Sequence, residues 1–267
     1  MELVVLGCSG SVAGPDRPAS GYVVRSDGTE DLLMDIGPGV LAAMQATEDI
    51  DPAQCHVAFS HMHADHCLDF PSLLVWRRFH PHAPSQRVHD FIGPRMAFEH
   101  LSRVAGDYPD QPDDFSDTFA VSHYQVGNSH FDATSWPSKN IGGLKIYAAE
   151  AVHTTESYLL RVHDGRGASL VYTGDTAYTE NLVNLATDAD VLLCEATWCD
   201  REFGMPQGMH MCGQDAGKVA EQAGVGKLIL THIPPWGDSD SAVAAAKRHF
   251  TGPVEVAYPG MRVQWGS

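Results

Sequence analysis

The stretch Ser60–Cys67 brings four side chains that can bind metal into six consecutive positions. It reads Ser-His-Met-His-Ala-Asp-His-Cys and supplies His61, His63, Asp65 and His66. On an extended segment, His61 and His63 share one face. A helix that begins at Asp65 turns that carboxylate and His66 in another direction. The spacing therefore favours two neighbouring metal ions over one.

The elements around this stretch place it where side chains can converge. The apolar segment Val57–Phe59 is expected to end a buried strand. The segment Leu68–Phe79 carries Pro71 near its start and is expected to be a helix. The candidate ligands then lie on a turn that leaves a strand, and a loop on a rigid scaffold can point several side chains into one small volume.

Polar residues recur just past the ends of other apolar strands. They are His153 after Leu144–Ala149, Asp175 after Ser169–Thr173, Glu195 after Val191–Cys194 and His232 after Lys227–Thr231. A single polar residue at a strand end is more often structural than functional. Because ligands bind at the carboxyl edge of an open α/β sheet, the repetition favours one shared site.

The remaining segments predict an α/β protein. Further strands are expected over Leu3–Leu6, Gly21–Arg25, Asp31–Asp35, Ser157–Val162 and Val254–Ala257. Further helices are expected over Val40–Thr47, Pro94–Ala105, Gln214–Gln222 and Ser241–Phe250. No domain linker or internal repeat is evident, so residues 1–267 are predicted to form a single domain.

Two polar segments have plain interpretations. Gly7–Ser11 is rich in glycine and serine but lacks the lysine of a phosphate-binding loop, so a tight turn near a pocket is expected. Gly106–Asp117 is acidic and is expected to be a solvated loop, because a calcium site needs a tighter ligand pattern with a turn glycine.

Five large side chains near the motifs allow two interpretations each. Trp76, Trp198 and Trp236 flank motif residues and could stack on a purine, or pack in the core or a lid. Arg77 and Arg78 could reach a phosphate, or form the solvated face of their helix.

Composition limits the classes of partner. The formal charge of −17, from 17 basic and 34 acidic residues, argues against a general nucleic-acid binder. No apolar run approaches the roughly 18 residues that span a bilayer, and the first residues lack a signal-peptide pattern. The six cysteines form no CxxC pair, as is typical of reduced cysteines. A cytoplasmic protein without a membrane partner is therefore expected.

The motif residues together resemble the metallo-β-lactamase fold superfamily. The match comprises His61-Met-His63-Ala-Asp65-His66, His153, Asp175 in Thr-Gly-Asp-Thr, and His232, in the family's order and over most of the chain. The resemblance implies a four-layer αββα sandwich, with two sheets packed face to face and helices on both outer sides. It also implies a pair of metal ions at one edge of the sandwich.

The resemblance and the donor types imply a ligand set. One metal is assigned to His61, His63 and His153, the other to Asp65, His66 and His232, with Asp175 as the bridge. Imidazole and carboxylate ligands suit two divalent ions, Zn²⁺ first, with Mn²⁺ or iron as alternatives. Such a pair is expected to generate a bridging hydroxide that attacks phosphorus in line with the leaving oxygen.

Within the superfamily, the chain is most similar to the branch of ribonuclease Z and phosphodiesterase-like enzymes. Cys194-Glu195-Ala196-Thr197 is similar to the branch's His-Glu-Ala-Thr, and His210 precedes an expected helix that contains Ala216. The catalytic candidates are His210 as proton donor, Glu195 as the group that orients it, and Asp65, which is also a metal ligand. The chain departs from the branch at Met211, where a serine or threonine is usual close to the histidine.

A second departure concerns the substrate. Ribonuclease Z enzymes generally carry a glycine- and proline-rich basic arm that grips transfer RNA, whereas Thr176–Cys194 contains no basic residue. The pattern resembles the actinobacterial type linked to cyclic-nucleotide hydrolysis.

The expected function is a dinuclear phosphodiesterase that acts on a small phosphodiester such as cyclic AMP. A ribonuclease Z-type RNA 3′-processing endonuclease and a non-catalytic metal-binding scaffold are the alternatives, and the same fold also supports thioester or lactam hydrolysis. A homodimer is implied by the resemblance alone.

Overall fold

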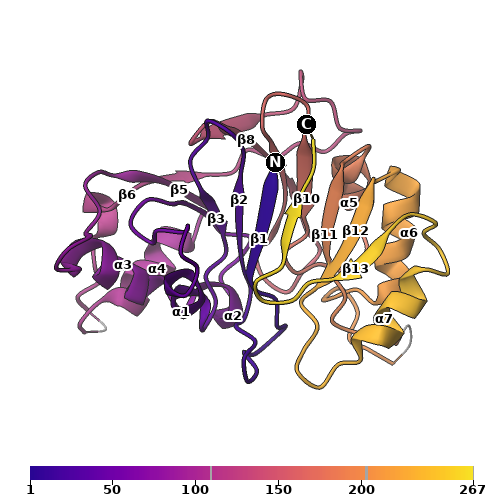
Figure 1. Cartoon of the computed structure of the whole chain (residues 1–267), viewed down its shortest axis with the longest axis horizontal. Coiled ribbons are helices and arrows are strands. Elements are labelled where there is room, and N and C mark those ends of the chain that lie inside the picture. The colour runs from indigo at the N-terminus through magenta and orange to yellow at the C-terminus, as the bar shows by residue number, and fades with distance from the viewer. Residues whose placement is uncertain (109, 202–203, 267) are drawn as a thin grey trace.

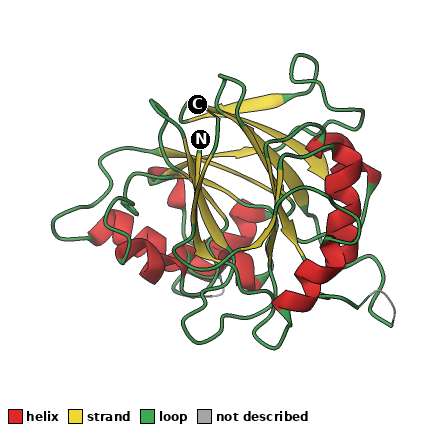
Figure 2. Cartoon of the chain, turned by 45° about the vertical axis from the view of Figure 1, so that its right-hand side comes forward, coloured by secondary structure: helices red, strands yellow, loops and turns green. Residues whose placement is uncertain are grey.

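Two seven-stranded sheets pack face to face, and the helices lie on their outer sides (Figures 1 and 2). This computed structural model describes residues 1–108, 110–201 and 204–266. The four-layer αββα sandwich predicted from the sequence is confirmed.

The first sheet carries the N-terminal half of the chain and the last strand. Its strands in spatial order are β14 (Arg262–Gln264), β1 (Glu2–Gly7), β2 (Gly21–Arg25), β3 (Leu32–Met34), β4 (His56–Ala58), β5 (His89–Gly93) and β6 (Phe119–His123). The pairs from β14 to β3 are antiparallel, and those from β3 to β6 are parallel. Its helices are α1 (Val40–Gln45), α2 (Ala64–Cys67), α3 (Phe70–Phe79) and α4 (Ala97–Ala105).

The second sheet carries the C-terminal half. Its strands in spatial order are β13 (Val254–Val256), β12 (Lys227–Thr231), β11 (Val191–Glu195), β10 (Ser169–Tyr172), β9 (Tyr158–His163), β8 (Leu144–Glu150) and β7 (Ser138–Ile141). Strands β10 to β13 are parallel, and β7 to β10 are antiparallel. Its helices are α5 (Glu180–Ala186), α6 (Gly213–Ala223) and α7 (Ser239–Ala246).

Alternation along the strands divides the buried side chains among three apolar layers. In β1, Leu3 and Val5 face the second sheet, whereas Val4 and Leu6 face the helices of the first sheet. The third layer lies between the second sheet and α5, α6 and α7. Because both faces of the central strands are covered, these strands are apolar throughout and were predictable from the sequence.

Several short elements were not predicted. They are α5, β5, β6, β7, β14 and a 3₁₀ turn at Phe115–Asp117. The edge strand β7 has three exposed residues of four, so it lacks the apolar alternation that marks a half-buried strand. The expected helix Leu68–Phe79 begins at Phe70, after the separate single turn α2.

Both interpretations of Arg77 were wrong. Its side chain is buried, and it donates hydrogen bonds to the carbonyls of Pro52 and Cys55 at 3.1 and 3.2 Å. Its guanidinium also lies 4.4 Å from the ring centroid of Phe119, so Arg77 is a structural clamp between α3 and distant loops.

Arg78 organises part of the acidic loop. It forms ion pairs of 2.6 Å with Asp113 and 2.7 Å with Asp117. The segment Gly106–Asp117 is therefore tied to α3 rather than solvated throughout; residue 109 lies outside the described residues.

Two further expectations concern the environment of the protein. All six cysteines lie within the described ranges, and each is a buried free thiol, as predicted. No helix among the described residues is long and apolar enough to cross a membrane.

Helix α3 offers a matched test of the first sheet's core. Phe70 is fully buried, with ring centroids 5.7 Å from Phe59 and 5.0 Å from Phe115, whereas Phe79 at the other end of α3 is 72% exposed. We expect Phe70→Ala to lower the free energy of unfolding by about 3–5 kcal/mol, because it opens a cavity. Phe79→Ala should change it by less than about 0.5 kcal/mol. Urea denaturation followed by circular dichroism measures both, and equal effects would contradict this packing.

Candidate metal centre

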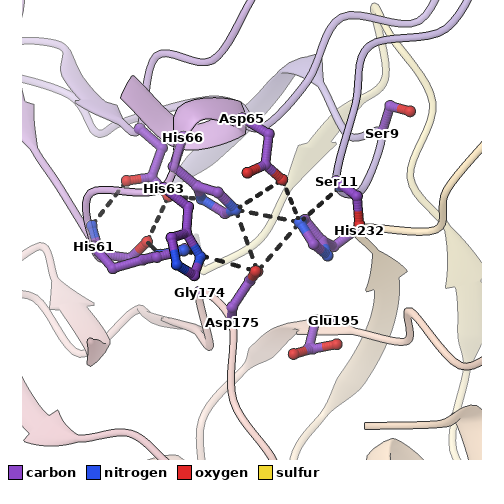
Figure 3. Close-up of polar contacts among 12 residues, drawn as sticks. Ser9, Ser11, His61, His63, Asp65, His66, Gly174, Asp175, Glu195 and His232 are labelled. Atoms are coloured by element: carbon purple, nitrogen blue, oxygen red, sulfur yellow. Dashed lines mark hydrogen bonds and ion pairs between the residues drawn. The ribbon is translucent and has the colours of Figure 1, made fainter. Parts of the chain in front are cut away.

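The polar residues that follow the apolar strands meet at one edge of the sandwich (Figure 3). His61 follows β4, His63 is the N-cap of α2, and Asp65 and His66 lie in α2. The second sheet supplies His153 after β8, Asp175 after β10, Glu195 at the end of β11 and His232 after β12. The shared site that the sequence predicts is therefore formed from both sheets.

Four residues form the first group of candidate ligands. The ligand atoms of His61, His63, His153 and Asp175 lie within 4.8 Å of one another. Asp175 Oδ2 is 3.7 Å from His61 Nε2 and 3.9 Å from His153 Nε2, which in turn is 3.1 Å from His63 Nδ1. His61 Nε2 is buried and has no hydrogen-bond partner among the described residues.

The second group contains Asp65, His66 and His232, again with Asp175. Asp175 Oδ1 lies 3.2 Å from both His66 Nε2 and His232 Nε2. Asp65 Oδ2 lies 3.1 Å from the same nitrogen of His232. The two oxygens of Asp175 thus face different groups, which is the arrangement that a bridging carboxylate needs. The grouping is the one predicted from the sequence, and metal binding by it stays a prediction.

Hydrogen bonds to the far side of the His153 and His232 rings leave a lone pair of each ring directed into the centre. His153 Nδ1 lies 2.8 Å from the carbonyl oxygen of Met209, which can only accept. Thr197 donates its hydroxyl proton to Glu195 Oε2 at 2.8 Å, so its oxygen accepts from His232 Nδ1, also at 2.8 Å. These contacts assign the lone pairs of His153 and His232 to Nε2, as in metal-ligating histidines.

The electrostatics of the second group fit a cation. Burial opposes charge on His66, yet Asp175, Asp65 and Asp35 together raise its pKa well above the usual value. Burial likewise opposes ionisation of Asp175, but His232 and His66 hold its pKa well below the ordinary range. Buried carboxylates are costly unless positive charge lies close to them, and a cation between the two groups would supply that charge. The nitrogen and oxygen donors suit Zn²⁺, Mn²⁺ or iron.

Sequence reasoning did not identify Asp35. This fully buried residue follows β3 with φ 59° and accepts hydrogen bonds from the backbone N–H and hydroxyl of Ser60 and from the hydroxyl of Tyr172. Its Oδ2 also lies 2.7 Å from His66 Nδ1, so Asp35 fixes the orientation of a candidate ligand. Asp35 is a carboxylate at a strand end, as Asp175 is, but it was counted as the last residue of the expected strand Asp31–Asp35.

Gly174 shows how tightly the centre is built. It has φ 51°, and a Cβ added there would lie 2.7 Å from the Cβ of Ser60. Only glycine accommodates both the left-handed backbone and this contact. The residue therefore brings Asp175 against the turn that carries His61.

His210 lies beside the first group and is held by Glu195. His210 Nδ1 is 3.0 Å from Glu195 Oε1 and 3.8 Å from Asp175 Oδ2. Glu195 is fully buried and also accepts from the backbone N–H groups of Thr176 at 2.7 Å and Met211 at 3.3 Å. The contact between Glu195 and His210 that the sequence suggested is present.

The surroundings of His210 favour its charged form. Burial lowers the pKa of the imidazole, but the carboxylates of Glu195, Asp175 and Asp65 raise it, so the net shift is upward. Its ring stacks on His232 with centroids 5.6 Å apart and meets the edge of Trp198 at 5.0 Å. Trp198 therefore packs on the site, whereas Trp76 stacks on His80.

Comparison with known sequences gives a consistent picture. Residues 31–233 match the family model described as a beta-lactamase superfamily domain. An uncharacterized protein of Mycobacterium tuberculosis is 46% identical over 254 residues, covering 95% of this chain and 88% of that protein. A ribonuclease Z of Haloarcula marismortui is 28% identical over 303 aligned residues, covering 98% of this chain and 96% of that protein.

The fold is also similar to that of a solved structure. The crystal structure of the metallo-beta-lactamase fold protein YhfI from Bacillus subtilis superposes with a TM-score of 0.81. The two sequences are 25% identical, and the match covers 98% of each chain.

Asp175 provides the sharpest test of the two candidate groups. We expect Asp175→Ala to remove or scramble metal binding, because both groups lose their shared carboxylate. Metal content after dialysis, measured by inductively coupled plasma mass spectrometry, checks this. Asp114→Ala, at an exposed carboxylate of the acidic loop, is the control and should keep the wild-type content. Wild-type metal content in Asp175→Ala would exclude the bridging role.

Proposed function

The chain belongs to the beta-lactamase superfamily and is a metal-dependent hydrolase, and from this premise we propose that it is a phosphodiesterase with two divalent ions. The proposed substrate is a small phosphodiester, a cyclic nucleotide such as cyclic AMP. The observation that carries the proposal is the contact of 3.0 Å between His210 and buried Glu195, beside the carboxylate shared by both ligand groups. A proton donor at this place can protonate an alkoxide leaving group as a general acid.

The residues around the centre have separable roles in this proposal. When bound, two divalent ions would supply a nucleophile at neutral pH and Lewis-acid stabilisation of phosphoryl oxygens. Asp175 holds the two ligand groups together, and Asp35 orients His66. Glu195 engages His210 at Nδ1, which leaves Nε2 to donate a proton or a hydrogen bond to the leaving oxygen.

Charge and topology favour a small substrate over transfer RNA. The segment between Asp175 and Glu195 contains no Lys or Arg and is occupied by the short helix α5. A formal charge of −17 also disfavours phosphate-backbone contacts. The similarity to a ribonuclease Z keeps RNA 3′ processing as the second candidate function.

A non-catalytic metal-binding scaffold is the candidate from another class. The ligand groups contain every residue that the sequence motif supplies, and His210 and Glu195 are positioned beside them. A protein that only binds metal has no need of this last pair, which supports the enzymatic proposal.

A substrate comparison tests the proposal. We expect metal-replete protein to hydrolyse cyclic AMP and bis(p-nitrophenyl) phosphate, and to leave a precursor transfer RNA intact. Product chromatography and gel electrophoresis measure the two activities with Zn²⁺, Mn²⁺ and Fe²⁺ in turn. Activity should disappear with a chelator and return with metal. Cleavage of the precursor RNA alone would favour the endonuclease, and inactivity on every ester and thioester would favour the scaffold.

His210 should act in turnover and not in metal binding. We expect His210→Ala to slow kcat by about 10²–10⁴, the usual contribution of an acid–base group, while the metal content stays at the wild-type value. Steady-state kinetics and metal analysis of the same sample decide this. Loss of metal in the variant would make His210 a ligand instead.

Glu195 should set the pH range of that step. The carboxylate raises the pKa of His210, so the protonated donor persists to higher pH. In Glu195→Gln the pKa of His210 falls, and the alkaline decline of kcat should begin at lower pH than in wild type. An unchanged or upward-shifted alkaline limb would contradict this positioning role.

A further inference from the structure

The turn after β1 lies directly on one ligand group, although the proposed mechanism does not use it. Ser9 forms a parallel bridge with Ile233, and the Gly10 N–H donates to the Ile233 carbonyl at 3.3 Å. A Cβ added to Gly10 would lie 2.2 Å from the carbonyl oxygen of His232. The absence of a side chain at residue 10 thus lets the turn press against the backbone of His232.

Ser11, the next residue, directs its backbone N–H at the centre. The Ser11 nitrogen is 3.5 Å from His232 Nε2, and Figure 3 shows Ser11 beside that ring. The same Nε2 lies 3.1 Å from Asp65 Oδ2 and 3.2 Å from Asp175 Oδ1. If His232 Nε2 gives its lone pair to a cation, it can no longer accept a hydrogen bond from the Ser11 N–H. The N–H is then free to donate to another ligand of that cation.

Ser11 has an unusual backbone conformation, and hydrogen bonds between its neighbours hold the turn in place. Its φ is 63°, in the left-handed region that side chains other than glycine rarely adopt. Ser9 Oγ donates to the Val12 carbonyl at 2.7 Å, and the Val12 N–H donates to the Gly10 carbonyl at 2.7 Å. Ser11 is exposed, and its hydroxyl has no hydrogen-bond partner in the described part of the chain.

We propose that Ser11 binds a non-bridging phosphoryl oxygen of the substrate through its backbone N–H and its hydroxyl. This inference rests on the proposed function of the site. Preorganised donors aimed at oxygens that gain negative charge stabilise such a transition state. The Ser11 N–H faces the Nε2 atom of His232, whereas His210 stacks on that ring and is held by Glu195. The two residues would then act on different oxygens of one phosphoryl group.

Two variants separate the donors of Ser11. Ser11→Gly removes the hydroxyl and suits the left-handed backbone, so the protein should fold at least as stably as wild type. The α-hydroxy analogue of serine at position 11 keeps the hydroxyl and replaces the N–H with an ester oxygen. Asp16→Gly is the matched control, because Asp16 is also exposed, has φ 54° and belongs to the same loop.

The first readout is calorimetric binding of inorganic phosphate to zinc-loaded protein of verified metal content. We expect Ser11→Gly and the ester variant each to weaken phosphate binding by about 5- to 50-fold, and Asp16→Gly to leave it unchanged. The second readout is kcat/KM for cyclic AMP, which should fall by about 10- to 100-fold in the two Ser11 variants. Wild-type phosphate affinity in both Ser11 variants would overturn the assignment. A wild-type protein that binds phosphate but hydrolyses no phosphodiester would contradict the proposed function alone.

Discussion

Seven ionisable side chains, five of them in buried residues, converge on one centre, and their mutual electrostatics is the constraint on which the rest of the structure depends. Burial opposes charge on Asp175 and His66, yet His232 and His66 lower the pKa of Asp175, and Asp175 and Asp65 raise the pKa of His66. Charges of this kind are costly unless they are paired and hydrogen-bonded. The centre therefore needs a scaffold that fixes every ring and carboxylate. A bound metal cation would interact with several of these donors at once, whereas a proton is bound by one or shared by two.

The two sheets meet this need by delivering side chains from their strand ends. Asp35 sits beneath the centre and joins the sheets, because it accepts from Ser60 of the first sheet and from Tyr172 of the second. Asp35 and His232 both have positive φ, near 59° and 55°. Such backbones persist where the surrounding structure holds them, and they are common at functional sites.

The motif residues could be predicted because their chemistry is local and dense. The four candidate ligands from His61 to His66 lie within six consecutive residues, so their sequence alone indicates a cluster. The other three, His153, Asp175 and His232, each follow an apolar segment that predicts a strand. Asp35 and Arg77 could not be found in this way, because the contacts of Asp35 with Tyr172 and of Arg77 with Pro52 join residues far apart in sequence. Strand β7 was not predicted because it is an exposed edge strand, whose residues show no apolar alternation.

The most direct measurement is the position of the metals themselves. A crystal structure of zinc-loaded protein, with anomalous data collected on both sides of the zinc edge, locates each ion without reference to activity. We predict two anomalous peaks about 3.5–4 Å apart, one on each side of the Asp175 carboxylate. A single peak, or peaks away from the two ligand groups, would contradict a dinuclear centre bridged by Asp175.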